Sequence, residues 1–363
     1  MTAIQTPGDL SIATRGSYVL TDVRAAIGAR IVDQLTIEVV NGTIISIGEG
    51  RHPGGALDGS GLLLVPGLVD THSDGLEKEA NPRRTAHFPI DYAIQAFEGR
   101  LRSSGITTVF HGVGYQEKPR SGRSIERARA LNQTINERRQ DPTARVDHRV
   151  LFRLEARDDS ALAPLLEDLE QGKLGSQPLV SFEDHTPGQG QYRDPARFAA
   201  ALDPEDIPEG LTAQQHVDDI MAEAERHLVT RQEIIEKLGP LAANGTFRLL
   251  AHDMESAADV AAAAAFSAAI AEFPLTVESA RAAKEAGMTV VMGAPNALRG
   301  SSHSGNASAR ELIAAGLCDV LASDYLPPAM LSAAFVMAAE GTCSLPRALH
   351  LITAGPADLA GLE

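Results

Sequence analysis

The chain has 363 residues, of which 44% are hydrophobic, and both values are typical of a protein with a sizeable buried core. Its 32 Lys and Arg residues and 48 Asp and Glu residues give a net charge of −16. This charge argues against general binding to nucleic acids or anionic membranes, because both require a positive surface. The sequence has no apolar run long enough to span a bilayer, and its first residues lack the pattern of a secretory signal. With only Cys318 and Cys343 as cysteines, we expect a reduced, cytoplasmic enzyme.

Residues 1–61 contain short β-type segments. The segments 17–27 and 33–50 are rich in Val, Ile and Thr and are interrupted by Asn-Gly and Gly-Glu-Gly turns. Such segments predict a small β-sheet rather than βα units. We therefore expect a small β-rich domain over residues 1–61.

From residue 62 onward, short apolar runs alternate with amphipathic helical stretches. Apolar runs of this kind predict strands buried on both faces of a parallel sheet. Eight strands that alternate with helices over about 260 residues match a (β/α)₈ TIM barrel, an α/β fold. We expect this barrel over residues 62–340, with 341–363 as a C-terminal helical tail that packs on it. The long gap at 187–246 is expected to cover the barrel mouth or to form a subunit contact. The eight predicted strands are 62–72, 106–111, 148–155, 178–185, 247–253, 268–274, 288–295 and 319–324.

Side chains that bind metal ions follow several of these strands, at the end of the barrel where catalytic residues lie. His72 and Asp74 point to the same side of their strand because they are two residues apart. Imidazole and carboxylate ligands together suit Zn²⁺, Mn²⁺ or Fe²⁺. We expect two divalent ions, bridged by Glu155, that lower the pKa of a water molecule whose proton Asp324 accepts. The predicted metal ligands are His72, Asp74, Glu155, His185, His252 and Asp324.

Two loops carry groups that suit an anionic substrate. The loop 293–306 is rich in Gly, Ser and Asn and contains Arg299, and loops after the seventh strand of such barrels often bind phosphate. An ordinary turn before a helix is the alternative interpretation. Lys78 and Arg83 follow the first strand. A role in substrate binding and a position on the solvated surface are equally compatible with the sequence. His111 ends the second predicted strand, which would let it line the site.

The small N-terminal sheet, the segment 66–74 (PGLVDTHSD) and the later His, His and Asp residues at strand ends resemble the amidohydrolase superfamily. Within it, the segments 184–192, 271–288, 291–306 and 322–335 resemble the PhnM family of phosphonate metabolism. The resemblance implies a diphosphatase of the C–P lyase pathway that uses divalent metals. It would convert α-D-ribose 1-methylphosphonate 5-triphosphate, a phosphorylated ribose, to the 5-phosphate and pyrophosphate.

The resemblance also assigns individual residues. His303 would act as a catalytic residue beside the general base Asp324. The chain departs from the family pattern at Gly75, His111, Gly190 and Met254, which leaves the exact substrate open. Because the superfamily usually continues with strands that complete the small sheet, we expect this sheet to be incomplete where the chain ends. The expected substrate-binding residues are Lys78, Arg83, Gln189, Asn296, Arg299, Ser304 and Asn306.

Two alternatives keep the same barrel. The first is a C–N hydrolase or deaminase for a small cyclic amide or amine, which would not need the polar loop at 293–306. The second is a catalytically silent binding protein, which would not need to retain every metal ligand. For the enzyme we expect a small-molecule substrate, no nucleic-acid or membrane partner, and pairing into a homodimer.

Overall fold

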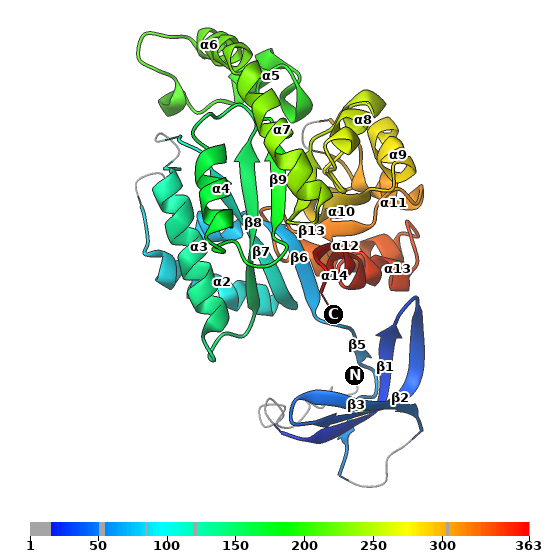
Figure 1. The fold of residues 1–363 in the computed structure, drawn as a ribbon. Coiled ribbons are helices and arrows are strands. Elements are labelled where there is room, and N and C mark those ends of the chain that lie inside the picture. Colours follow the sequence, from blue (N-terminus) through cyan, green and yellow to red (C-terminus); the bar gives the residue numbers. More distant parts are fainter. Residues whose placement is uncertain (1–15, 51–54, 84–85, 119–121, 303–304, 363) are drawn as a thin grey trace. The chain divides into compact units, whose positions relative to one another are not determined.

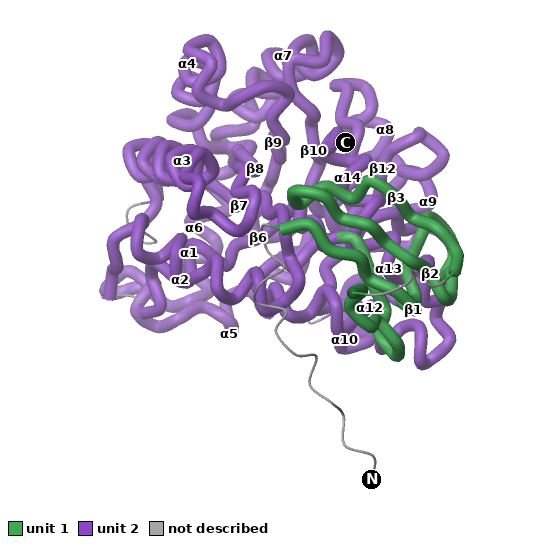
Figure 2. Tube along the Cα trace, turned by 90° about the horizontal axis from the view of Figure 1, so that it is seen from below, with its two compact units in different colours: residues 1–66 green, residues 67–363 purple. Residues whose placement is uncertain are grey.

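The computed structural model describes residues 16–50, 55–83, 86–118, 122–302 and 305–362. The chain divides into two compact units, Met1–Pro66 and Gly67–Glu363, which Figure 2 colours separately. Each unit has its own sheet. Among the described residues, no helix combines the length and apolar character needed to cross a membrane.

The first unit is the small β-sheet that the sequence predicts. Its strands are β1 (Tyr18–Ile27), β2 (Arg30–Val40), β3 (Thr43–Glu49), β4 (Leu57–Asp58) and β5 (Leu63–Leu64). The first three strands are antiparallel neighbours, and β4 and β5 pair with β1 in parallel. Asn41 and Gly42 both have positive φ at the β2–β3 turn, the conformation that a tight hairpin requires. Alternating side chains bury one face: Val23, Ala25, Leu35, Ile37 and Val39.

The second unit is an eight-stranded parallel barrel, so the predicted fold class is confirmed. Its strands follow each other in chain order around the sheet, and a bridge between Ser73 and Asp324 joins the last strand to the first. Every residue of β6 and β9 is buried, as expected of strands in a parallel sheet that is covered on both faces. The strands are β6 (Leu68–Ser73), β7 (Ile106–Tyr115), β8 (Asp147–Glu155), β9 (Leu179–Glu183), β10 (Arg248–His252), β11 (Ile270–Glu272), β12 (Thr289–Gly293) and β13 (Val320–Ala322).

Two sequence-based boundaries are wrong. The strand predicted over 62–72 is divided, because β5 belongs to the small sheet and β6 begins only after Pro66 and Gly67. Proline cannot donate to a strand ladder, which explains the interruption. The segment 293–306 is not a loop throughout, because it begins with a short helix, α10 (Ala294–Arg299), that ends at Gly300 in the left-handed region.

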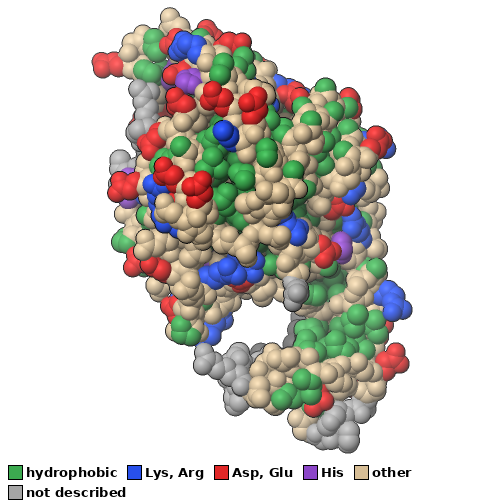
Figure 3. Space-filling model, in the orientation of Figure 1, with side chains coloured by type: hydrophobic (Ala, Val, Ile, Leu, Met, Phe, Trp, Pro, Cys, Tyr) green, Lys and Arg blue, Asp and Glu red, His purple; other side chains and the backbone are tan. Residues whose placement is uncertain are grey.

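Helices cover the outside of the barrel, as Figure 1 shows. On the face drawn in Figure 3, acidic and basic side chains are interspersed rather than gathered by charge. Ser124, Ser256 and Thr276 accept backbone N–H groups at the first turns of three helices. The outer helices are α1 (Gly75–Ala80), α2 (Ile90–Ser103), α3 (Ile125–Gln140), α4 (Leu162–Glu170), α8 (Ala257–Ala265), α9 (Val277–Glu285), α11 (Ala309–Ala314) and α12 (Ala329–Ala339).

The chain that follows α12 closes the amino-terminal end of the barrel. It forms α13 (Leu345–His350) and α14 (Ala354–Ala360). Between them, the carbonyls of Leu351 and Ile352 accept N–H groups from β13 and β6, at 2.7 and 3.0 Å. Leu359 of α14 joins an apolar cluster with residues of seven barrel strands: Phe110, Leu151, Leu179, Leu250, Ile270, Val291, Val320 and Ala322.

The long insertion between β9 and β10 is helical. It contains η3 (Gly190–Tyr192), α5 (Pro195–Ala201), η4 (Pro204–Asp206), α6 (Ala213–Arg226) and α7 (Leu228–Ala243). In Figure 1, α5 and α6 lie above the strands, in the upper part of the barrel unit. Tyr192 and Phe198 of this insertion contact each other edge to face and line the main pocket, so the insertion contributes to the barrel mouth.

Candidate metal centre

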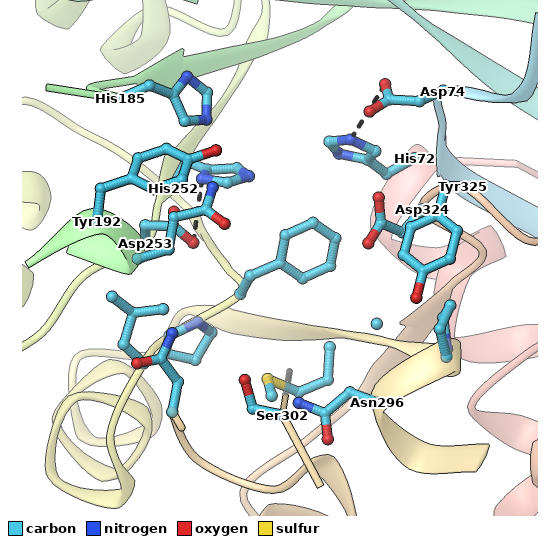
Figure 4. A pocket seen from close by; sticks show the side chains of 18 of the residues that line it. His72, Asp74, His185, Tyr192, His252, Asp253, Asn296, Ser302, Asp324 and Tyr325 are labelled. Atoms are coloured by element: carbon cyan, nitrogen blue, oxygen red, sulfur yellow. Dashed lines mark ion pairs between the residues drawn. The ribbon is translucent and has the colours of Figure 1, made fainter. Parts of the chain in front are cut away.

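A pocket of about 510 Å³ lies at the carboxyl ends of the barrel strands. Two groups of three potential metal ligands line it, and within each group the ligand atoms lie within 4.8 Å of one another. Figure 4 shows the two groups on opposite sides of the pocket. The first group is His72, Asp74 and Asp324, and the second group is His185, His252 and Asp253.

Backbone pairing between the first and last strands assembles the first group. The N–H of Asp74 donates to the carbonyl of Asp324 at 2.7 Å, and the N–H of Asp324 donates to the carbonyl of His72 at 2.9 Å. Asp324 has φ +56°, a conformation that is rare outside glycine and is common at functional sites. Asp253 and Phe273 have the same kind of φ after their strands, so strained backbone lines several sides of the pocket.

Glu272 orients His72. Its Oε1 lies 2.8 Å from Nδ1 of His72, and its Oε2 accepts the Ser181 hydroxyl at 2.6 Å. Burial alone would lower the pKa of His72, but the Glu272 carboxylate raises it well above its usual value. With Nδ1 engaged, Nε2 is the ring nitrogen that His72 presents to the pocket, 3.7 Å from Asp74 Oδ1. A carboxylate behind a ligating histidine is a common feature of metal sites.

Glu155 has the equivalent role in the second group. It accepts the backbone N–H of His185 at 2.9 Å, and its other oxygen lies 3.0 Å from Nδ1 of the same residue. Glu155 lines the pocket but belongs to neither ligand group, so its role as a bridging ligand, which the sequence predicts, stays a prediction. Asp253, which the sequence analysis did not select, lies in the second group, with Oδ1 3.2 Å from Nδ1 of His252. Burial would lower the pKa of His252, but Asp253 and other carboxylates raise it to about 9.

Arg153 connects the two sides of the centre. Its Nη1 donates to Asp74 at 2.7 Å, and its Nε donates to Glu183 at 2.8 Å. Burial would raise the pKa of both carboxyls, but the guanidinium holds both well below the usual range. Sequence reasoning missed Arg153, Glu183 and Glu272. One sequence pattern could have identified Arg153. It lies two residues before Glu155 in a predicted strand, so both side chains point to the same side of β8.

Burial also raises the pKa of the Asp324 carboxyl above its usual value, and His72 acts in the opposite direction. The carboxyl faces the pocket beside His72 and Asp74, as Figure 4 shows. Both groups offer imidazole nitrogen and carboxylate oxygen without thiolate, so the donor set fits divalent ions such as Zn²⁺ or Mn²⁺.

Only some of the predicted substrate-binding residues line the main pocket. Asn296, Arg299 and Asn306 line the pocket. The side-chain amide of Asn296 bonds to the backbone of Ala307 and Ala309, at 3.1 and 3.0 Å, and so braces the following loop. His303 and Ser304 lie outside the described residues.

The remaining predicted substrate residues do not line this pocket. Gln189 lines a separate cavity of about 250 Å³ and accepts a hydrogen bond from Arg157 at 2.9 Å. Nζ of Lys78 lies 4.6 Å from the ring centroid of Tyr325, which does line the pocket. Arg83 pairs with Ala86 in an isolated bridge.

The expectation that His111 lines the site is wrong. Strand β7 continues to Tyr115, so His111 lies within the strand. Its ring stacks on His148 at 5.2 Å and lies 5.9 Å from the ring of Phe97 in α2. It therefore faces the layer between the barrel and the helices.

The fold is similar to several solved hydrolases. A variant of triazine hydrolase matches at TM-score 0.57 and 13% identity, over 95% of this chain and 83% of that one. N-acetyl-D-glucosamine-6-phosphate deacetylase from Mycobacterium smegmatis matches at TM-score 0.54 and 15% identity, over 95% and 90%. Guanine deaminase from C. acetobutylicum matches at TM-score 0.53 and 13% identity, over 95% and 87%. The fold is that of the amidohydrolase superfamily, and the chain is a hydrolase of this class.

A closer relative defines the family. The chain is 35% identical over 332 residues to alpha-D-ribose 1-methylphosphonate 5-triphosphate diphosphatase from Escherichia coli strain K12, covering 90% of this chain and 86% of that protein. The chain therefore belongs to the PhnM family of diphosphatases, as the motifs indicated. No family model matches the chain.

Proposed function

We propose that this protein hydrolyses α-D-ribose 1-methylphosphonate 5-triphosphate to the 5-phosphate and pyrophosphate, in phosphonate catabolism. The observation that carries the proposal is the 35% identity, over 90% of the chain, to an enzyme named for this substrate. The pocket supports it, because Lys118, Arg123, Arg153 and Arg299 line it and an anionic substrate requires such groups.

Arg299 gives further support. Its guanidinium donates to the carbonyl of Ser301 at 3.4 Å, and the described residues supply it with no carboxylate partner. A guanidinium at the mouth of a pocket matches the geometry of a phosphate group and binds it through two hydrogen bonds. A neutral cyclic amide, the substrate of the C–N hydrolase alternative, would leave this charge unused.

The two ligand groups would hold divalent ions, one in each group. Ions at these positions would supply Lewis-acid activation of a water molecule and of the phosphoryl oxygens. Asp324 accepts the proton of the attacking water at its carboxylate. Glu272 and Glu155 keep His72 and His185 in their orientations, and Arg153 holds Asp74 in place.

³¹P NMR of the Mn²⁺-loaded protein with the triphosphate tests the proposal. We expect pyrophosphate and a 5-phosphate ester to appear together. Failure of a metal-loaded sample to release pyrophosphate would overturn the substrate assignment, and hydrolysis of a neutral cyclic amide instead would favour a C–N hydrolase.

The substitution Asp324→Asn tests the general base. It should lower kcat by about 10²- to 10⁴-fold while the far-UV circular dichroism spectrum is unchanged. Asp358→Asn, which removes an exposed carboxylate from α14, is the matched control and should keep wild-type turnover. An Asp324→Asn variant with wild-type kcat would rule out the base assignment.

A further inference from the structure

Four cationic side chains among the described residues line the main pocket, and they have different partners. Arg153 contacts Asp74 and Glu183 within the metal centre, and Arg299 donates to the carbonyl oxygen of Ser301. Lys118 and Arg123 lie in a third part of the chain, between β7 and α3. The sequence analysis did not select either residue.

Backbone pairing brings Lys118 and Arg123 together. The N–H of Lys118 donates to the carbonyl of Arg123 at 3.0 Å, and the N–H of Arg123 donates to the carbonyl of Lys118 at 3.3 Å. Residues that exchange both hydrogen bonds in an antiparallel pair lie directly opposite and project their side chains to the same face. Both side chains line the pocket, and Nζ of Lys118 lies 3.6 Å from Oε2 of Glu155, so this face is directed at the site.

Glu77 of α1 holds the Arg123 guanidinium in a fixed orientation. Nε donates to one carboxylate oxygen at 2.8 Å, and Nη2 donates to the other at 2.7 Å. A guanidinium has five N–H groups, and this fork uses two of them. The remaining N–H groups lie on Nη1 and Nη2. A ligand that accepted them would meet a guanidinium that Glu77 already holds in place, with little further loss of side-chain entropy.

The strand order places this pair beside the first group and across it from Arg299. Strand β6, which contains His72 and is followed by Asp74, neighbours β7, and Asp324 follows β13, which neighbours β12. The pair Lys118 and Arg123 follows β7, whereas Arg299 ends the helix that follows β12. The first metal group therefore lies between two cationic walls of one pocket.

We infer that Lys118 and Arg123 form a second phosphoryl-binding subsite, separate from the wall that carries Arg299. The inference rests on the proposed function, whose substrate has anionic groups at both ends of a ribose. The ligand of this subsite is a phosphoryl or phosphonyl group, which is either the departing diphosphate or the methylphosphonate end. Lysine supplies a point charge and Glu77-bound arginine supplies fixed donors, a combination suited to tetrahedral oxyanions.

Calorimetric titration of the Mn²⁺-loaded protein with pyrophosphate, and separately with methylphosphonate, tests the inference. Arg123→Met and Lys118→Met should each weaken the same probe by about tenfold or more, the loss typical of a charged hydrogen bond. Weaker binding of pyrophosphate assigns the subsite to the diphosphate, and weaker binding of methylphosphonate assigns it to the phosphonate end.

Arg100→Met is the control. Arg100 is an exposed residue of α2, and its Nη1 lies 3.1 Å from Oε2 of Glu79. The substitution therefore also removes a cation that is paired with a glutamate, but away from the pocket. Both probes should bind this variant within twofold of the wild-type affinity. Glu77→Gln, which weakens the fork without removing a pocket cation, should weaken the same probe by a smaller factor. It keeps the inference testable if Arg123→Met fails to fold.

The inference is overturned if both probes bind Arg123→Met and Lys118→Met within twofold of the wild type. The direct titration needs no turnover, so it separates this inference from the proposed function. A protein that fails to hydrolyse the triphosphate but loses pyrophosphate affinity in Arg123→Met would keep the subsite and lose the substrate assignment. A protein that hydrolyses the triphosphate but binds both probes equally well in the wild type and the variants would keep the substrate assignment and lose the subsite.

Discussion

At the scale of single residues, the centre depends on side chains that stand behind the predicted ligands. His72 and His185 were predicted from their positions at strand ends, but the groups that orient them, Glu272 and Glu155, come from other strands. Glu272 is fully buried, and its two oxygens serve His72 and Ser181. A buried carboxylate with both oxygens engaged has a fixed position, and it fixes the ring that it contacts.

Substitution of Glu272 tests this role. Glu272→Gln should lower the affinity for Mn²⁺ by about 10- to 100-fold, because the amide is a weaker acceptor and His72 loses its orientation. Calorimetric titration with Mn²⁺ measures the change. Glu285→Gln, on the exposed surface of α9, makes the same chemical change away from the centre and should bind Mn²⁺ normally. Equal affinities in the two variants would contradict the positioning role.

At the scale of elements, α14 closes the barrel opposite the catalytic end. Leu359 is only 3% exposed and belongs to the cluster that fills the amino-terminal part of the barrel. Arg248 at the start of β10 donates to the carbonyls of Asp358 and Leu359, at 3.1 and 2.6 Å. These hydrogen bonds satisfy two carbonyl groups at the end of the helix, which would otherwise lack partners.

The cost of removing this closure can be measured. Leu359→Ala should lower the free energy of unfolding by about 2–5 kcal/mol, the range for a buried leucine whose cavity does not collapse. Urea denaturation gives the value. Leu211→Ala, at an exposed position in the long insertion, should cost less than about 1 kcal/mol. A loss in Leu359→Ala as small as that of the control would show that α14 does not stabilise the barrel.

A second element-scale feature is a buried chain of polar groups between the barrel and its helices. His111 lies 2.9 Å from His148, which lies 3.1 Å from Glu98 of α2, and Arg138 of α3 contacts the same carboxylate. Burial lowers the pKa of both histidines, and for His148 the Glu98 carboxylate only partly compensates. The unfolded chain therefore binds protons more readily than the folded chain below the ordinary histidine pKa of about 6.5.

The stability that these two neutral histidines contribute is therefore lost as the pH falls below about 6.5 and is fully present above it. His111→Phe removes one of these groups, so its free energy of unfolding should fall less between pH 7.5 and 5.5, by about 1 kcal/mol. Urea denaturation at both pH values measures the difference. His216→Phe, at a partly exposed position of α6, should leave the pH dependence of the wild type unchanged. Equal pH dependence in His111→Phe and the wild type would refute the linkage.

At the scale of the whole molecule, the barrel gathers carboxylates that repel one another at one end. Asp74, Asp253 and Asp324 belong to the two ligand groups, and Glu183 and Glu272 form a further close cluster with His252. Arg153 neutralises part of this charge. Divalent ions bound to both groups would neutralise more, and they would stabilise the folded state because the unfolded chain lacks the sites.

Addition of Mn²⁺ to EDTA-treated protein should therefore raise the thermal unfolding midpoint. At about 100 times the dissociation constant, one bound ion stabilises the fold by about 2.7 kcal/mol. His185→Asn should retain the contribution of the first group and lose that of the second, with a correspondingly lower metal content by elemental analysis. His227→Asn, at a partly exposed histidine of the long insertion, should bind as much metal as the wild type. A midpoint insensitive to Mn²⁺ would count against the metal centre.

The sequence by itself determined that the barrel has eight strands, their order, and the ligand residues at the carboxyl ends of several of them, although it misplaced the start of β6 and the end of β7. Each of these follows from local patterns, because a strand buried on both faces is a short apolar run and its last residues stand next to it in the chain. The motifs also determined the family. Only the tertiary structure decided which groups face one another across the pocket. His72 and Glu272 are 200 positions apart, and Arg153 and Asp74 are 79 apart, and no local pattern encodes either pair. The barrel brings them together because parallel strands end at the same edge, and it selects Lys118 and Arg123, rather than Lys78 and Arg83, as cations of the pocket.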